Sequence, residues 1–332
     1  EPGAAYVAAT RYKLDDTTPY LYKTTDYGET WTRITNGIPD HDFTRVIRED
    51  PNRRGLLYAG TETGIYISFD DGANWQRLGG NLPVVPIYDF VIKGTDLVVA
   101  THGRSFWILD DLTQIHQIAD SGPEGVHLFQ PRETWRLRRY RPISGEPLPR
   151  GIVQYGASGA SQIFYEVTEN PDGEPETLIF NAGTNPPDGL VVQYYLSEAP
   201  EGDVSLTFLD AEGNTIRTYP NPDDPGAKQP PAKAGLNRFV WNLRYPGATP
   251  VGAPDLEPWA RDDGPRIVPG RYQVRLTVGD VNQTKPFEVV LDPRVTTSAE
   301  DLAEQRDFLL EVRDRLSATN ELVNQVDSVR DQ

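Results

Sequence analysis

The sequence of 332 residues contains no cysteine, so a cysteine nucleophile is excluded. The remaining candidates for catalysis include four histidines and many carboxylates. His41, His102, His116 and His127 lie far apart, and none has the spacing of a zinc motif such as H-E-x-x-H. No serine occupies the G-x-S-x-G turn of a hydrolase. We therefore predict no catalytic residue, no metal site and no cofactor in this chain.

His102 and Arg104 are the residues best placed to contact a ligand. They follow a predicted strand at residues 97–101, so they lie at the edge of a strand-rich segment. Stabilisation of the turn itself is the alternative role. We favour the turn-stabilising role, because polar side chains in tight turns usually bond to the nearby backbone.

Asp and Glu together number 49, and hydrolysis of a glycosidic bond needs two carboxylates across a cleft. With so many candidates, the sequence does not single out a pair. The net charge of −17 argues against binding to nucleic acid or to an anionic membrane surface through bulk electrostatics. No apolar run approaches the roughly 20 residues of a membrane-spanning helix.

The strongest pattern is an eight-residue segment, TTDYGETW at residues 24–31, which returns as SFDDGANW at residues 68–75. We call these the first and second octapeptides. Each follows a short apolar run that reads as a strand, and the Asp-x-Gly order is typical of a hairpin turn. We expect the Asp to accept turn N–H groups, the Gly to take a positive φ and the Trp to pack between sheets. The positions with these structural roles are Thr24, Asp26, Gly28, Trp31, Ser68, Asp70, Gly72 and Trp75.

The octapeptides belong to three strand-rich repeats within residues 1–118. Their offset of 44 residues (24 to 68) predicts the blades of a β-propeller. The predicted inner strands are residues 5–10, 56–61 and 97–101, and residues 105–111 align with 64–70 although no Gly or Trp follows. A propeller closes with about four to eight blades. We therefore expect further blades upstream in a longer protein, or in another chain, and the start at Glu1 without an initiator Met fits such a segment.

The octapeptides resemble the Asp box of BNR-type repeats, which occur in sialidases, in two-propeller xyloglucanases and in sortilin or Vps10-like proteins. Residues 101–112, 183–189, 235–246 and 269–272 also resemble segments of large bacterial BNR-repeat proteins, often labelled sortilin-like or glycosyl hydrolase. The resemblance implies the C-terminal portion of such a protein, exported to the periplasm or the cell exterior. It implies structural Asp boxes away from the ligand face, with a metal or sugar ligand at Asp26 or Asp70 as the alternative.

Residues 119–150 are predicted to be a connector that carries a basic cluster. Its members are Arg132, Arg136, Arg138, Arg139, Arg141 and Arg150. The interpretation that we favour is that these arginines pair with carboxylates of the neighbouring domains. An anion or acidic-glycan site is the alternative.

The rest of the chain is predicted to be an Ig-like β-sandwich at residues 151–293 and a helix at 297–332. Alternating strands and a hairpin turn at 210–214 support the sandwich, and residues 246–270 read as a long loop. A capping box at 297–301 opens the helix. Its apolar stripe recurs every seven residues with interleaved valines, so we expect it to be buried and to mediate self-association. The apolar stripe comprises Leu302, Leu309, Val312, Leu316, Val323 and Val326.

Two functions fit these features. The first is a non-catalytic binding or scaffolding module of an exported propeller protein, which recognises a peptide or a glycan. The alternative is the C-terminal part of a glycoside hydrolase, similar to a sialidase or xyloglucanase, whose catalytic residues lie mostly upstream. We favour the binding module, because nothing in the sequence supplies paired carboxylates facing a propeller channel.

Overall fold

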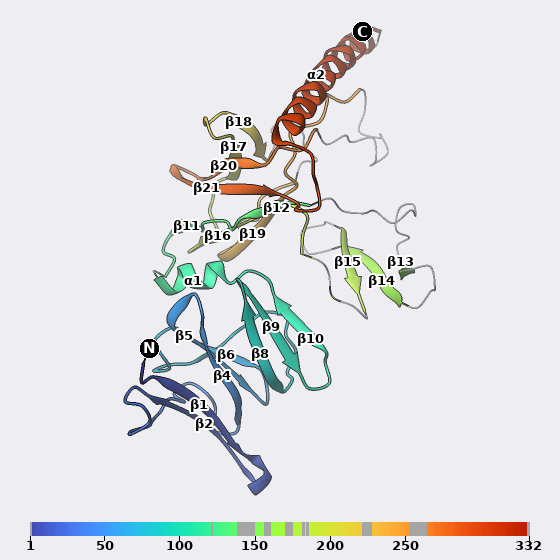
Figure 1. Ribbon diagram of the computed structural model, residues 1–332. Coiled ribbons are helices and arrows are strands. Elements are labelled where there is room, and N and C mark those ends of the chain that lie inside the picture. The colour runs from blue at the N-terminus through green and yellow to red at the C-terminus, as the bar shows by residue number, and fades with distance from the viewer. Residues whose placement is uncertain are drawn as a thin grey trace. The chain divides into compact units, whose positions relative to one another are not determined.

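The fold is mainly β in the computed structural model, with several antiparallel sheets and one long C-terminal helix (Figure 1). The structure describes residues 2–120, 122–137, 150–155, 161–169, 175–180, 183, 186–220, 228–251 and 264–330. The chain divides into two compact units. The first unit comprises Glu1–Arg132, Tyr194–Ala199 and Lys233–Leu236, and the second comprises Glu133–Gln193, Pro200–Ala232 and Asn237–Gln332.

Three separate antiparallel sheets build the first unit (Figure 1). The first sheet contains β1 (Ala5–Arg11), β2 (Asp16–Thr24) and β3 (Thr32–Arg33), with a short 3-10 helix at Tyr12–Leu14. The middle sheet contains β4 (Thr44–Asp50), β5 (Arg53–Thr61), β6 (Ile65–Ser68) and β7 (Gln76–Arg77). The third sheet contains β8 (Ile87–Lys93), β9 (Asp96–Thr101) and β10 (Phe106–Leu109). None of these sheets closes into a barrel within the described residues.

The first two sheets repeat each other in detail. Val7 pairs with Tyr22 in the first sheet, and Ala59 pairs with Tyr66 in the middle sheet. The guanidinium of Arg33 donates to the carbonyl of Pro19 at 2.9 Å, and that of Arg77 donates to Thr63 at 2.7 Å. Tyr22 and Tyr66, Arg33 and Arg77, and Pro19 and Thr63 each differ by the 44-residue offset of the octapeptides, so the repeat extends beyond the turns.

Two of the strands predicted as inner strands are not the first strands of their sheets. β5 and β9 each follow another strand, β4 or β8, in the order of the sheet. β4 is not evident as a strand in the sequence because four of its seven residues, Arg45, Arg48, Glu49 and Asp50, are charged and read as loop positions. β4 and β8 each lie at one edge of their sheet, next to the strand that was predicted to be the inner one.

The middle sheet is buried on both faces. On one face Leu57, Ala59, Tyr66 and Trp75 pack against residues of the first sheet and its loop. On the other face, side chains of β5 and β6 join a core with residues of the third sheet. This second group comprises Leu56, Tyr58, Ile65, Ile67, Ile87, Phe90, Leu97 and Val99. The three sheets therefore form a stack held by two apolar interfaces.

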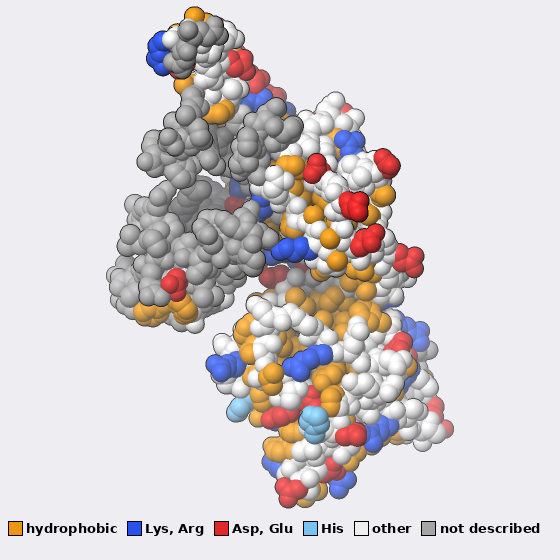
Figure 2. Space-filling model, turned by 180° about the vertical axis from the view of Figure 1, so that it is seen from behind, with side chains coloured by type: hydrophobic (Ala, Val, Ile, Leu, Met, Phe, Trp, Pro, Cys, Tyr) orange, Lys and Arg blue, Asp and Glu red, His pale blue; other side chains and the backbone are white. Residues whose placement is uncertain are grey.

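Each outer sheet of the stack exposes an apolar face. In the first sheet, Val7 is 42% exposed and Trp31 is 44% exposed. In the third sheet, the register places Val91, Val98 and Ile108 side by side, and Ile108 is 58% exposed. Exposed apolar patches of this kind commonly mark interaction surfaces. Figure 2 shows hydrophobic side chains gathered on the surface of the first unit.

The predicted connector contains regular elements. A helix, α1 (Thr113–Asp120), follows the third sheet, and β11 (Val126–Leu128) pairs with the end of β16 (Leu190–Leu196). β12 (Thr134–Arg136) runs parallel to β21 (Val281–Leu291). Residues 138–149, with Arg138, Arg139 and Arg141, lie outside the described residues.

A five-stranded sheet forms the core of the second unit, in the order β12-β21-β20-β17-β18. Its other strands are β20 (Gly270–Val278), β17 (Val204–Leu209) and β18 (Thr215–Tyr219). The rings of Phe208 and Trp241 stack at 4.2 Å, and Trp241 closes β19 (Gly235–Trp241). A separate antiparallel sheet contains β13 (Arg150–Tyr155), β14 (Ser161–Glu169) and β15 (Pro175–Ile179). The predicted hairpin at 210–214 is present, since the amide of Asn214 donates to Asp210 at 2.7 Å.

The C-terminal helix α2 (Ala299–Arg330) begins where the capping box predicts. The hydroxyl of Ser298 accepts the amide of Asp301 at 3.1 Å, as an N-cap residue does. None of the helices in the described residues combines the length and the hydropathy that a bilayer-spanning segment requires.

Within this chain the apolar stripe of α2 is largely exposed, so the burial expected for it would have to come from a partner outside the chain. Leu302 is buried, but Leu309 is 41% exposed and Val326 is 67% exposed. The helix contacts its own unit through a polar face instead. Asn320 donates to the carbonyl of Thr249 at 2.7 Å, and Asn324 donates to that of Pro250 at 2.9 Å. Figure 2 shows hydrophobic side chains along the surface of α2.

Candidate functional site

The two octapeptides form the same hydrogen-bonded turn. In the first, Asp26 accepts the amide of Thr30 at 2.9 Å and its hydroxyl at 2.6 Å. In the second, Asp70 accepts the amide of Asn74 at 2.8 Å and its side-chain amide at 2.7 Å. The hydroxyl at the first position bonds to the same carboxylate in each turn, at 2.7 Å from Thr24 and 2.8 Å from Ser68. Both oxygens of each Asp are thus used within the turn.

The backbone of each turn depends on glycine. Gly28 has φ of 90° and Gly72 has φ of 88°, in the left-handed region that glycine enters without steric cost. The amide of Gly28 donates to Thr24 at 3.0 Å, and that of Gly72 donates to Ser68 at 2.9 Å. In both turns the Asp thus accepts turn N–H groups and the Gly has a positive φ, and the first hydroxyl bonds to the Asp and to the Gly amide.

The tryptophans of the two octapeptides differ in environment. Trp75 is 5% exposed, and its amide donates to the carbonyl of Asn36 at 2.8 Å. Trp31 is 44% exposed in the first octapeptide. Trp75 thus packs between sheets as predicted, whereas no described segment covers Trp31 in the same way.

Asp71 links the second octapeptide to the first sheet through a hydrogen bond and an ion pair. Its carboxylate accepts hydrogen bonds from the hydroxyl of Tyr6 and the ammonium of Lys23. Burial, together with the hydrogen bond to Asp71, raises the pKa of Tyr6. Tyr27 holds the corresponding position in the first octapeptide, where it is 81% exposed.

A polar groove of about 420 Å³ lies between the two turns. It is lined by Lys23, Thr25, Thr32, Arg33, Asn36, Asp70 and neighbouring residues of both octapeptides. The carboxylates of Asp70 and Asp71 in this groove are bonded to Asn74, Tyr6 and Lys23. They are therefore committed to holding the turns and are not free to act as an acid–base pair.

His102 and Arg104 lie together in a tight turn at the end of β9. The amide of Arg104 donates to the hydroxyl of Thr101 at 3.2 Å, and its carbonyl accepts the indole N–H of Trp107 at 2.9 Å. The ring of His102 meets that of Tyr88 edge-on at 4.8 Å. The side chains of His102 and Arg104 are exposed. The backbone amide and carbonyl of Arg104 form the hydrogen bonds that stabilise the turn.

Tyr88 extends this contact into a row of stacked side chains that sequence reasoning missed. The guanidinium of Arg45 lies 4.3 Å from the ring of Tyr88 and 4.9 Å from that of Phe43. Phe43 stacks in turn on Tyr12 at 5.0 Å. The side chains from Tyr12 to His102 thus form a continuous row, which we call the aromatic row. Arg45 and Tyr88 lie on β4 and β8, whereas Tyr12, Phe43 and His102 lie in a 3-10 helix and in loops beside the sheets, so only the folded unit brings them together.

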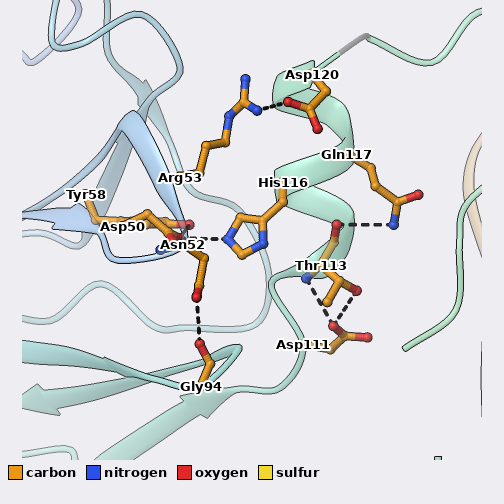
Figure 3. Close-up of polar contacts among 10 residues, drawn as sticks. All are labelled: Asp50, Asn52, Arg53, Tyr58, Gly94, Asp111, Thr113, His116, Gln117 and Asp120. Atoms are coloured by element: carbon orange, nitrogen blue, oxygen red, sulfur yellow. Dashed lines mark hydrogen bonds and ion pairs between the residues drawn. The ribbon is translucent and has the colours of Figure 1, made fainter. Parts of the chain in front are cut away.

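A largely buried polar contact of the first unit joins Asp50 and His116 (Figure 3). The His116 Nε2 lies 2.8 Å from the Asp50 carboxylate, whose side chain is inaccessible to solvent. The amide of Asn52 donates to the same carboxylate at 2.8 Å, and the hydroxyl of Tyr58 donates at 3.3 Å. Burial, with Asp50 as a further cause, raises the pKa of Tyr58.

Neighbouring contacts show that this cluster attaches α1 to the β4–β5 hairpin. Arg53 forms an ion pair with Asp120 at the end of α1, and Asn52 donates to the carbonyl of Gly94 at 2.9 Å (Figure 3). The Asp50–His116 contact is one of these links between α1 and the hairpin. Asp50 and His116 are 66 positions apart, which is why no local pattern predicts their contact.

The basic cluster does not act as a single group. Arg132 lies 3.2 Å from Asp96 and 3.9 Å from Asp111, which matches the predicted pairing with carboxylates. Arg136 forms no hydrogen bond or ion pair among the residues that the structure describes. Within the same residues, no group of three or more His, Asp or Glu side chains could hold a metal ion.

Comparisons with known proteins give little further information. No protein-family model matches the chain, and no curated protein matches it. One solved structure that it resembles is the extracellular domain of BT4673, assigned as a one-component system, from B. thetaiotaomicron. The identity is 12% and the TM-score is 0.23, over 82% of this chain and 55% of that one. The chain thus spans about half the length of that domain.

Proposed function

We propose that this chain is a non-catalytic binding and scaffolding module of an exported propeller protein that resembles BNR-repeat and sortilin-like proteins. The first unit would supply consecutive propeller blades with Asp boxes, and the second unit an Ig-like sandwich. The observation that carries the proposal is the stack itself. Its middle sheet is covered on both faces, while the outer sheets expose the corresponding faces.

The repeat supports the view that these outer faces receive further sheets. The pair Ala59 and Tyr66 is covered by the first sheet, whereas its counterpart, Val7 and Tyr22, has no such cover. A sheet edge or face left open is an association site. Further blades, from the same protein or another chain, would complete the array.

Sedimentation of the chain tests the scaffolding part of the proposal. Serine substitutions at Val7 and Trp31, or at Phe106 and Ile108, should lower concentration-dependent association and binding of the dye ANS. Matched serine substitutions at Leu14 and Val84 remove exposed apolar side chains outside the strands of these sheets. Equal effects of the test and control variants would contradict the proposal.

The aromatic row is the ligand-contacting surface that we infer, and a glycan is the ligand that it suits best. Tyr12 is 39% exposed and Tyr88 is 45% exposed, so each offers part of its ring to a ligand. The apolar face of a sugar ring packs on such rings, while the phenol hydroxyl stays available for hydrogen bonds. His102 and Arg104 extend the row with polar groups.

An array of immobilised neutral and acidic oligosaccharides tests this inference. Binding is expected, and Tyr88→Ala or His102→Ala should weaken it at least tenfold. Tyr27→Ala is the matched control, since Tyr27 is exposed outside the row. Binding that survives both row variants, or preference for an array of unstructured peptides, would overturn the glycan assignment. Turnover of any oligosaccharide by the chain would overturn the non-catalytic one.

A further inference from the structure

The third sheet of the first unit lacks a strand that the other two sheets contain. In the middle sheet β7 pairs with β6, and in the first sheet β3 pairs with β2. β10 is the equivalent of β6, because residues 105–111 align with residues 64–70. In the described part of the chain β10 pairs with β9 alone and lies at the edge of its sheet (Figure 1). The position that β3 and β7 fill is therefore open beside β10, and we call it the open edge of β10.

The chain after β10 turns away instead of returning along it. Asp70 and Asp111 have equivalent positions in the alignment. Asp70 accepts the amide of Asn74, four residues on, and so closes the turn that leads into β7. Asp111 accepts the amide and the hydroxyl of Thr113 instead, at 3.0 and 2.6 Å, where α1 begins. A fourth strand of the third sheet therefore has to come from another segment.

The backbone of β10 offers hydrogen bonds at the open edge. The amide of Leu78, which follows β7, donates to the carbonyl of Ile65 at 2.8 Å, and Ile34 forms the equivalent bond in the first sheet at 2.9 Å. Phe106 is the equivalent of Ile65. Because hydrogen-bonded positions alternate along antiparallel strands, the N–H and C=O groups of Phe106 and Ile108 point toward the open edge. Backbone groups of this kind are a template for an added strand.

The side chains of β10 are apolar and are exposed to an unusual degree. Phe106 is 74% exposed and Ile108 is 58% exposed. Their equivalents in β6, Ile65 and Ile67, are each 2% exposed. An edge strand with such side chains promotes association unless a partner pairs with it.

The two strands that fill this position elsewhere share a pattern. Each of β3 and β7 consists of a polar residue and an arginine, and an aliphatic residue follows, which is Ile34 or Leu78. Ile34 belongs to one apolar interface of the stack, and Leu78 packs against the other. The aliphatic residue thus anchors the strand by its side chain as well as by its amide.

The arginine of the pattern has a substitute in the third sheet. Arg77 donates to the carbonyl of Thr63 at 2.7 Å. Arg104 is the equivalent of Thr63, and its carbonyl accepts the indole N–H of Trp107 at 2.9 Å. A strand added beside β10 therefore needs the aliphatic residue but not the arginine.

We propose that the open edge of β10 binds an extended segment from outside this chain as a fourth, antiparallel strand. The segment carries an aliphatic residue at the position that Leu78 has beside β6. This inference rests on the scaffolding part of the proposed function, but it concerns the edge of the sheet and backbone hydrogen bonds. The serine variants described above test the face of the sheet, so the two tests can fail separately.

A labelled peptide of residues 73–79, which contains the β7 segment, serves as the probe. Fluorescence anisotropy with the full chain should show saturable binding. Methylation of the peptide's amide nitrogen at Leu78 removes the donor to Phe106 and should weaken binding about tenfold or more. Methylation at Arg77, whose amide points away from β10, is the matched control and should change binding less than about twofold. In the peptide, Leu78→Asp should also weaken binding, whereas Arg77→Ala should not.

Hydrogen–deuterium exchange locates the bound peptide. Protection is expected at residues 106–109 and not at β1, which is also the edge of a sheet. Absence of binding, equal effects of the two methyl groups, or protection at β1 instead would overturn the proposal. If exchange at residues 106–109 slows as the concentration of the chain alone rises, a second copy fills the edge, and that result would also overturn it.

Discussion

The indole N–H of Trp75 donates to the backbone carbonyl of Ile34 at 2.8 Å, so the last residue of the second octapeptide is bonded to the loop after the first sheet. Trp31 has the same position in the first octapeptide but lies at the open side of the stack. Whether an octapeptide contributes to stability thus depends on the sheet that faces it.

Replacing each tryptophan by alanine should have unequal effects. Trp75→Ala removes a buried ring and a buried hydrogen bond, and should lower the free energy of unfolding by about 3–5 kcal/mol. Trp31→Ala removes a half-exposed ring and should cost roughly 1 kcal/mol or less. Urea denaturation followed by circular dichroism measures both. Similar costs would mean that Trp31 is covered in solution.

Gly37→Ala should loosen the same interface. A Cβ at Gly37 would lie 2.1 Å from the carbonyl oxygen of Trp75, and the φ of Gly37 is +98°. Gly80 is the matched control, since its φ is +104° and nothing lies within 4 Å of a Cβ there. Both variants lose about 1 kcal/mol from the backbone. Only Gly37→Ala should also increase the exposure of Trp75 to a fluorescence quencher, and an equal increase in both would contradict this contact.

Stability should fall on acidification between about pH 4 and pH 2, in part because of Asp26. Hydrogen bonds from the hydroxyl and amide of Thr30 lower the pKa of Asp26 to about 2, from an ordinary value of 3.8. A carboxylate whose pKa is lower in the folded chain stabilises the fold above its unfolded pKa, and this stabilisation disappears as pH falls through the folded value. Asp26→Asn should therefore flatten the pH dependence of the urea midpoint in this range. Asp40→Asn is the control, and if it flattens the curve equally, Asp26 is not responsible.

His116→Ala should release α1 from the β4–β5 hairpin. Asp50 would keep the amide of Asn52 and the hydroxyl of Tyr58, but it would lose its contact at 2.8 Å. A loss of roughly 1–3 kcal/mol is expected for a buried acceptor that loses a partner. Limited proteolysis should then cut near residues 113–120 sooner than in the native chain. His41→Ala, at an exposed position, should change neither quantity, and a silent His116→Ala would show that the contact is dispensable.

Association through the apolar stripe of α2 stays a prediction. The heptad spacing of Leu302, Leu309, Leu316 and Val323 is that of a two-helix coiled coil, so a second copy of the helix is the partner expected. The chain should sediment as a concentration-dependent oligomer, and removal of residues 298–332 should abolish this. Leu316→Lys should weaken it, whereas Arg315→Lys should not. A monomer with the intact helix would refute the pairing.

Local patterns made the octapeptides and the start of α2 predictable. Asp26, Thr30 and Gly28 lie within one turn, so their spacing alone determines the hydrogen bonds that they can form. Ser298 and Asp301 form an N-cap in the same way. In each case the partners are at most four residues apart, and no tertiary contact has to be known.

Contacts between distant segments were beyond the reach of the sequence. Arg45 and Tyr88, and Asp50 and His116, come from different sheets or from a sheet and a helix. The polar contacts of α2 with its own unit were likewise not evident from the sequence. The helix forms hydrogen bonds to the backbone carbonyls of Thr249 and Pro250. A hydropathy pattern contains no information about such bonds.

The contact of α2 with residues 246–250 has an evolutionary consequence. The helix supplies side chains, Arg313, Asn320 and Asn324, whereas the loop supplies the carbonyls of Pro246, Thr249 and Pro250. A carbonyl is present whatever residue carries it. Among homologues, substitutions at Pro246 and Pro250 should therefore accumulate freely, whereas the asparagines of the helix are retained, as is Thr249, whose hydroxyl donates to Glu321 at 3.4 Å.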